Sequence, residues 1–259
     1  MTERTVRPKL RTFAYGTGLA AAGLLSLVAI EAAVARQRRY ARPELSLAHR
    51  GSVGRPAATP LRLVLLGDST AAGVGVEQAS DTVGGQLAEL LAADGYRVEL
   101  SNVAVAGARS GELATQVARA LLGQRPDLAV ILIGANDAIR PGRAETSAAL
   151  LGTAVRRLRR AGVPVVAGTC PDLGAARAIA QPLRALVARR GRTLASAQNA
   201  AVREAGGVPV DLAAETGVMF RTDPGTLCWD DYHPSADGYR LWAHALAPAC
   251  RTALSIATH

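Results

Sequence analysis

The 259-residue chain contains few aromatic residues, only 3% of the total, and its single lysine is Lys9. Without large aromatic side chains, a core has to be built from Ala, Val and Leu, and a hydrophobic content of 49% suffices for one well-packed domain. Aromatic and basic residues do not alternate as a stacking platform for single-stranded nucleic acid requires. The composition therefore argues against a nucleic-acid partner.

Several motifs of other protein classes are also missing. The chain has neither G-x-x-x-x-G-K-[ST] nor G-x-G-x-x-G, although Gly73-Val74-Gly75 lies in a loop of small residues, so a nucleotide-binding domain is disfavoured. It lacks G-x-S-x-G, the nucleophile elbow of α/β-hydrolases. No CxxC pair or His/Cys cluster indicates a metal site.

Positive charge is concentrated near the N-terminus. The formal net charge is +9, and residues 1–42 contain eight basic and two acidic residues, which leaves +3 for the rest of the chain. This distribution differs from the broad basic surface of a nucleic-acid-binding domain. The basic residues of this N-terminal segment lie instead on both sides of the apolar run 12–30.

The apolar run, residues 12–30, carries no charged residue, and helical apolar segments of about 20 residues span a bilayer. We expect residues 1–35 to form a basic segment and a single-pass membrane anchor, with the folded domain outside the cytoplasm. The alternative is a signal peptide cleaved after Ala33-Val34-Ala35, which would release a secreted protein. Residues 36–60, rich in Arg, Pro, Gly and Ser, are expected to form a linker.

Short apolar runs alternate with helical patterns over residues 61–259, the expected folded domain. This alternation predicts a parallel sheet with helices on both faces, in which functional loops follow the carboxyl ends of the strands. The expected strands are Leu61–Leu66, Arg97–Val103, Leu128–Ile133, Pro164–Gly168 and Val208–Asp211. The expected helices lie near 79–94, 110–122, 143–161 and 176–205, with a last one from Ser235 to about Ala253.

Residues suited to acyl transfer lie after the first strand and before the last helix. Ser69 follows the first strand, and a serine hydroxyl is a weak nucleophile unless a base takes its proton. His233 can be that base, and Asp230 can hold its imidazole in the required tautomer. Asp231 is the alternative partner, and an ordinary turn is the alternative explanation of Ser69.

Donors for a developing oxyanion lie after the first three strands. The backbone N–H groups of Ser69 and Gly107 and the side-chain amide of Asn136 can supply three. Glycine at position 107 would also let the backbone approach a substrate closely. Asp68 and Asp137 are expected to tie the loops together through hydrogen bonds to the backbone.

The blocks Gly67-Asp68-Ser69, Gly107, Gly134-Ala135-Asn136-Asp137 and Asp230-Asp231-Tyr232-His233 resemble the four blocks of the SGNH hydrolases, or GDSL-type esterases and lipases. The resemblance covers about residues 61–250, and its one departure is Thr70 where the family name has leucine. It implies a flavodoxin-like three-layer α/β/α sandwich with about five parallel strands. It also implies Ser69 as nucleophile, His233 as base, Asp230 as its partner, and Ser69, Gly107 and Asn136 as oxyanion donors, without a metal or organic cofactor.

The expected function is serine-dependent hydrolysis of carboxylic esters, of lipids or acylated sugars, through an acyl-enzyme. An acyltransferase with the same triad is one alternative, and a membrane-tethered domain that binds without catalysis is another. The oligomeric state stays open. The substrate pocket is expected to be lined by residues 71–80, 138–145, 171–182 and 213–228.

The three cysteines, Cys170, Cys228 and Cys250, allow one disulfide if the domain is extracytoplasmic. Cys170 follows the fourth strand and Cys228 lies just before Asp230, so both are placed near the predicted site. We expect that pair if a disulfide forms, and three reduced thiols otherwise.

Overall fold

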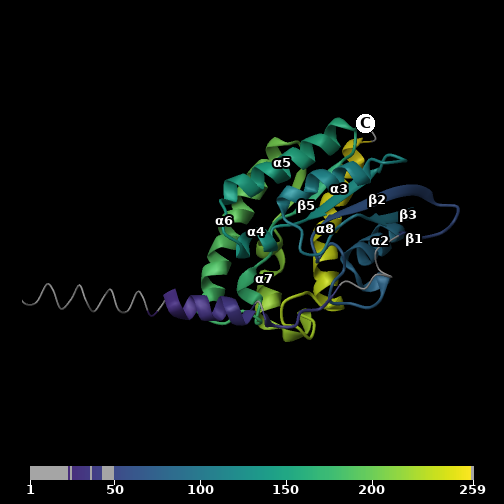
Figure 1. The fold of residues 1–259 in the computed structure, drawn as a ribbon. Helices are drawn as coiled ribbons and strands as arrows, with labels where there is room; N and C mark the ends of the chain where they lie inside the picture. The colour runs from purple at the N-terminus through teal and green to yellow at the C-terminus, as the bar shows by residue number, and fades with distance from the viewer. Residues whose placement is uncertain (1–22, 24, 36, 43–49, 258–259) are drawn as a thin grey trace, which may run out of the picture.

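The computed structural model describes residues 23, 25–35, 37–42 and 50–257, which fold around one six-stranded sheet (Figure 1). The strand order is β1-β3-β2-β4-β5-β6, with β1 antiparallel to β3 and all other neighbours parallel. The strands are β1 (Arg50–Val53), β2 (Thr59–Gly67), β3 (Tyr96–Asn102), β4 (Leu128–Leu132), β5 (Val165–Gly168) and β6 (Val208–Val210). The five predicted parallel strands are thus confirmed, each with ends within two residues of those expected.

Strand β1 lies in the segment that was predicted to be a linker. Its four residues, Arg-Gly-Ser-Val, pair with β3 in the register Arg50↔Ser101 to Val53↔Val98. An isolated strand of this length and composition has no apolar alternation, so the sequence pattern contained no signal for it. It extends the sheet at the edge furthest from β6.

Helices cover both faces of the sheet, which confirms the predicted three layers (Figure 1). One face is covered by α2 (Val83–Ala93), α7 (Leu212–Thr222) and α8 (Ala236–Ala257). The other is covered by α3 (Leu113–Ala120), α5 (Ala144–Arg160) and α6 (Leu183–Glu204). Shorter helical elements within residues 50–257 are α4 (Ala135–Ile139) and the 3-10 turns η2 (Ala79–Asp81), η3 (Ser110–Glu112), η4 (Leu173–Ala175) and η5 (Pro224–Thr226).

The central strand shows why the sheet needs two helical layers. Leu63 and Leu65 pack with the core under α2 and α8, whereas Val64 and Leu66 pack with the core under α3 and α5. Successive side chains of a strand point to opposite faces, so a run that is apolar at every position requires cover on both. All four side chains are buried.

Three helices differ from the predicted pattern. The expected helix over 176–205 begins only at Leu183, because Pro182 lacks an N–H group and disfavours helical conformation in the residue before it. Helices α4 and α7 were not predicted, since α4 is a five-residue turn after β4 and α7 lies in a segment assigned to the pocket wall.

The N-terminal segment lies against the domain rather than apart from it. Residues 25–35 are helical and lie along the domain (Figure 1). Glu31 accepts a hydrogen bond from the Leu183 N–H at the start of α6. Within the described residues, no helix is both long enough and apolar enough to cross a membrane. Most of the run predicted to be an anchor, residues 12–30, lies outside the described residues.

Candidate active site

Ser69 is presented by a tight turn at the carboxyl end of β2. Gly67 adopts φ +141°, and a Cβ at that position would overlap the carbonyl of Leu132 on the neighbouring strand. The chain then turns at once, with the Asp68 N–H donating to Leu132 O at 3.0 Å and the Val74 N–H to Ser69 O at 2.9 Å. The apolar strand therefore ends in glycine because only glycine permits this close approach.

The structure brings together Ser69, His233 and Asp230. Ser69 Oγ lies 3.0 Å from His233 Nε2, and His233 Nδ1 lies 2.7 Å from Asp230 Oδ2. Both His233 and Asp230 are buried. The neighbouring Asp231 has φ +60° and pairs with Arg38 at 3.7 Å, so the carboxylate that contacts the imidazole is Asp230.

Asp230 is surrounded by hydrogen-bond donors. Its Oδ1 accepts from the backbone N–H groups of Tyr232 and His233, each at 2.8 Å, and from the Cys228 thiol at 3.1 Å. Its Oδ2 accepts from the Ala41 N–H at 2.9 Å, besides contacting the imidazole. Burial raises the pKa of Asp230, but hydrogen bonds from His233, Ala41 and Cys228 outweigh it and hold that pKa well below the usual range of aspartate. Asp230 is therefore an anion at neutral pH.

All three cysteines are free, and the expected Cys170–Cys228 disulfide is not formed. Cys228 instead donates to Asp230, and burial raises the pKa of its thiol to about 11, so the donor proton is retained at neutral pH. Cys170 and Cys250 are buried among apolar side chains. Of the two alternatives, the structure therefore has the three reduced thiols, with Cys228 near the site as expected.

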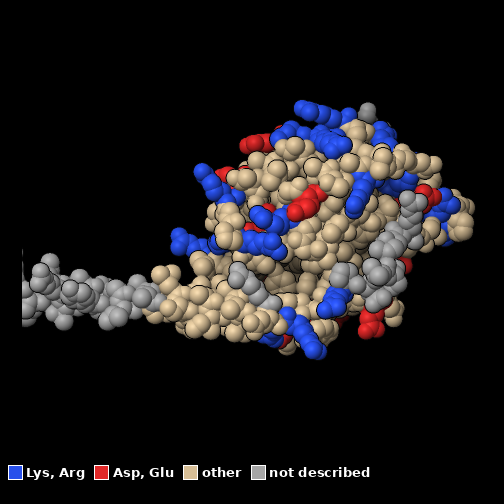
Figure 2. Space-filling view, in the orientation of Figure 1, with Lys and Arg blue, Asp and Glu red and all other residues tan. Residues whose placement is uncertain are grey.

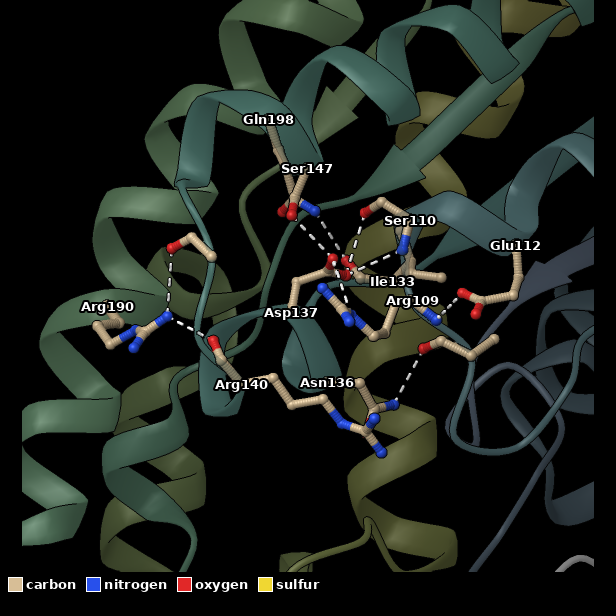
Figure 3. Close-up of polar contacts among 12 residues, drawn as sticks. Arg109, Ser110, Glu112, Ile133, Asn136, Asp137, Arg140, Ser147, Arg190 and Gln198 are labelled. Atoms are coloured by element: carbon tan, nitrogen blue, oxygen red, sulfur yellow. Dashed lines mark hydrogen bonds and ion pairs between the residues drawn. The ribbon is translucent and has the colours of Figure 1, made fainter. Parts of the chain in front are cut away.

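The expected oxyanion donors have open hydrogen-bonding capacity. Among the described residues, neither the Ser69 N–H nor the Gly107 N–H has an acceptor. Gly107 has φ +81°, a conformation that side chains disfavour, although the space around it is open. The Asn136 amide donates to Ala108 O at 3.1 Å, which fixes the side chain beside the Gly107 loop and leaves its second N–H group free (Figure 3).

Asp68 and Asp137 hold loops in place, as predicted. Asp68 Oδ1 accepts from the backbone and hydroxyl of Thr70, at 2.9 and 2.8 Å. Asp137 Oδ2 accepts from the backbone and hydroxyl of Ser110, and its Oδ1 accepts from the Ser147 hydroxyl at 2.8 Å (Figure 3). Asp137 thereby joins α4, η3 and α5, and this keeps the adjacent Asn136 in position.

A small, mainly apolar cavity of about 40 Å³ adjoins Ser69. Parts of two predicted pocket segments, 171–182 and 213–228, line it, whereas 71–80 and 138–145 do not. The larger side chains in its wall are Leu173, Phe220, Leu227, Tyr232 and Trp242. Tyr232 and Trp242 were not predicted, since aromatic residues in a late loop and helix reveal nothing about which cavity they border.

Basic side chains lie over the surface rather than in this cavity. Figure 2 shows them dispersed over the visible face, with a few acidic side chains among them. In the segments expected to line the pocket, Arg221 pairs with Asp172, Arg177 donates to Phe220 O at 3.4 Å and Arg143 pairs with Glu145 at 3.6 Å. The cavity therefore offers an acyl group an apolar environment.

Solved structures of other proteins share this fold. The lipase/acylhydrolase from Enterococcus faecalis has 25% sequence identity and a TM-score of 0.60, covering 73% of this chain and 94% of its own. The acetylxylan esterase from Geobacillus stearothermophilus has 21% identity and a TM-score of 0.57, covering 76% of this chain and 96% of its own.

Sequence comparison identifies a further relative and a family. A GDSL-like esterase of Mycobacterium tuberculosis is 48% identical over 198 residues, which are 75% of this chain and 63% of that protein. The chain thus spans less than two thirds of this relative's length. The sequence model of the GDSL-like lipase/acylhydrolase family matches residues 65–241, from β2 to α8, and includes every residue of the predicted triad. The chain belongs to the GDSL-like lipase/acylhydrolase family.

Proposed function

We propose that the protein hydrolyses carboxylic esters, with Ser69 as nucleophile, His233 as general base and acid, and Asp230 as the partner of His233. The observation that carries the proposal is the chain of contacts from Ser69 Oγ through the imidazole to the Asp230 carboxylate, at 3.0 and 2.7 Å. Hydrogen-bonding distances of this size allow proton transfer between the groups. Membership of a lipase/acylhydrolase family supports the same reaction class.

Acylation begins when Ser69 Oγ attacks the ester carbonyl carbon and its proton passes to His233 Nε2. The carbonyl oxygen becomes an oxyanion, which accepts hydrogen bonds from the N–H groups of Ser69 and Gly107 and from the Asn136 amide. His233 then returns the proton to the departing alkoxide oxygen, so the alcohol leaves and the acyl group stays on Ser69. Asp230 remains ionised and stabilises the imidazolium that forms in between.

Deacylation repeats these steps with water as the nucleophile. His233 accepts a proton from water as the oxygen adds to the acyl carbon, and the bond to Ser69 Oγ breaks when that proton returns to Oγ. The products are a carboxylic acid and free Ser69.

The proposed substrates are esters of short acyl groups. A cavity of about 150 Å³ holds benzene, so the cavity of about 40 Å³ beside Ser69 has room for roughly one or two carbon atoms. Acetyl and propionyl groups fit this space, and long acyl chains do not. This size favours acylated sugars or other short esters over long-chain lipids.

The test is hydrolysis of p-nitrophenyl acetate by the full-length chain and its Ser69→Ala variant. We expect the variant to lose nearly all activity, because the acyl-enzyme can no longer form. Ser52→Ala, an exposed serine on β1, is the matched control and should retain full activity. Full activity of the folded Ser69→Ala variant would refute the proposal.

A further inference from the structure

The N-terminal segment is tied to the loops around the active site. We define the N-terminal strap as residues 31–35 and 37–41. Glu31 Oε2 accepts from Leu183 N at 2.8 Å, and Arg38 Nη1 donates to Ala178 O at 3.2 Å. Ala41 N donates to Asp230 Oδ2 at 2.9 Å. The strap therefore joins the start of α6 to the loop that carries Asp230 and His233.

The contact of Ala41 falls on the oxygen that holds the imidazole. Asp230 Oδ2 lies 2.7 Å from His233 Nδ1, and the Ala41 N–H is its other hydrogen-bonding partner among the described residues. Every other donor to Asp230 comes from the same loop, between Cys228 and His233. Among the described residues, only the strap therefore fixes the Asp230 carboxylate from outside its own loop and the imidazole that it holds.

Tyr40, the residue before Ala41, packs on the same imidazole. Its ring centroid lies 5.4 Å from that of Tyr232 and 6.5 Å from that of His233, with the rings nearly perpendicular. Edge-to-face contacts of this kind restrict ring rotation. Tyr232 itself lies 5.0 Å from His233, so Tyr40 and Tyr232 form one aromatic cluster against the His233 ring.

The far end of the strap is anchored by a charge. Helix α6 begins after Pro182, which provides no side-chain cap, and the Leu183 N–H is satisfied by the Glu31 carboxylate instead. A carboxylate at a helix N-terminus also interacts favourably with the helix dipole. This contact explains an acidic residue directly after an uncharged run, which a membrane anchor does not.

We propose that the N-terminal strap positions the catalytic pair, with the Ala41 N–H orienting Asp230 and Tyr40 confining the ring of His233. The inference rests on the proposed function, since it assigns the strap a role in the reaction of that triad. Ala41 and Tyr40 are positioning residues, because they act on substrate only through Asp230 and His233. The strap therefore governs kcat rather than substrate binding.

The first test removes the Ala41 N–H from the full-length chain. Ala41→Pro has no N–H group, whereas Ala41→Ser keeps it and adds one hydroxyl. For Ala41→Pro we expect a roughly tenfold lower kcat and a KM within about twofold of the wild-type value. Losing a hydrogen bond that orients a metal ligand has an effect of this size on metal sites. For Ala41→Ser we expect a near-normal kcat. An unchanged kcat for folded Ala41→Pro, an equal loss in Ala41→Ser, or a rise in KM alone would overturn the inference.

A second variant tests the role of the strap if the Ala41→Pro variant does not fold. Glu31→Ala/Arg38→Ala removes two ties of the strap and leaves the backbone of Ala41 intact. We expect a severalfold lower kcat, compared with no change in Glu89→Ala/Arg119→Ala, which removes two exposed charges from α2 and α3. A wild-type kcat in Glu31→Ala/Arg38→Ala would refute the positioning role of the strap and leave the proposed function intact. Full esterase activity in the Ser69→Ala variant would instead refute the proposed function.

Discussion

The size of the cavity beside Ser69 predicts the acyl preference. Each methylene that leaves water for an apolar site contributes about 0.8 kcal/mol, or roughly fourfold in kcat/KM. With room for roughly one or two carbon atoms, p-nitrophenyl acetate and propionate should be the best substrates, and activity should fall from butyrate to octanoate.

Phe220→Ala enlarges this cavity and should move the optimum. Phe220 is 6% exposed and packs against Trp242, with ring centroids 5.7 Å apart. Removing its ring opens space for at least two more methylenes, worth about 1.6 kcal/mol or roughly fifteenfold in the ratio of hexanoate to acetate hydrolysis. The same change should lower the free energy of unfolding by about 3–5 kcal/mol.

The assay is a chain-length series of p-nitrophenyl esters from acetate to octanoate, measured as kcat/KM. Val218→Ala, on the same helix but 60% exposed, is the control and should leave the series unchanged. Phe220→Leu retains most of the volume and gives a smaller shift if the alanine variant does not fold. A wild-type optimum at octanoate, or an unchanged ratio in folded Phe220→Ala, would refute this account of the cavity.

Three further predictions concern the site. Asp230→Asn should lower kcat about 10⁴-fold, since a neutral amide does not hold the imidazole in the active tautomer, while Asp231→Asn should cost far less; equal losses would contradict the assignment. Asn136→Ala should lower kcat by about 10²–10³ through loss of an oxyanion donor, and unchanged steady-state kinetics would exclude that role. Cys228 should react slowly with iodoacetamide at pH 7 and faster as the pH approaches about 11, because burial raises the pKa of its thiol to about 11. Rapid labelling of Cys228 in the folded chain at pH 7, measured by mass spectrometry, would contradict this prediction.

The pattern of the sequence predicted the sheet because each parallel strand is a short apolar run with a polar or glycine end. The predicted triad followed from where those ends lie, since Ser69 comes directly after β2 and the three-residue spacing of Asp230 and His233 suits one loop. Side-chain chemistry and element order suggested these residues, and the resemblance to the SGNH hydrolases assigned their roles and favoured Asp230 over Asp231. Side-chain chemistry and element order can both be recognised without knowing which distant segments are in contact.

The features that escaped prediction depend on such contacts. Strand β1 pairs at the sheet edge without any apolar alternation, and Ala41 contributes only a backbone N–H, which no side-chain motif reveals. The contact of Glu31 also escaped prediction, because its partner, Leu183, is 152 residues away. Removal of residues 1–42 to eliminate that run would also delete Ala41, so the full chain is the appropriate material for kinetics.

The most direct test of the central assignment is covalent labelling of the native full-length chain with a fluorophosphonate, followed by intact-mass and peptide analysis. Ser69 should take up one phosphonyl group per chain, because its Oγ lies within hydrogen-bonding distance of a buried imidazole–carboxylate pair. The Ser69→Ala variant should take up none. A native chain that stays unlabelled, or a label that remains in the Ser69→Ala variant, would contradict the assignment of Ser69 as the nucleophile.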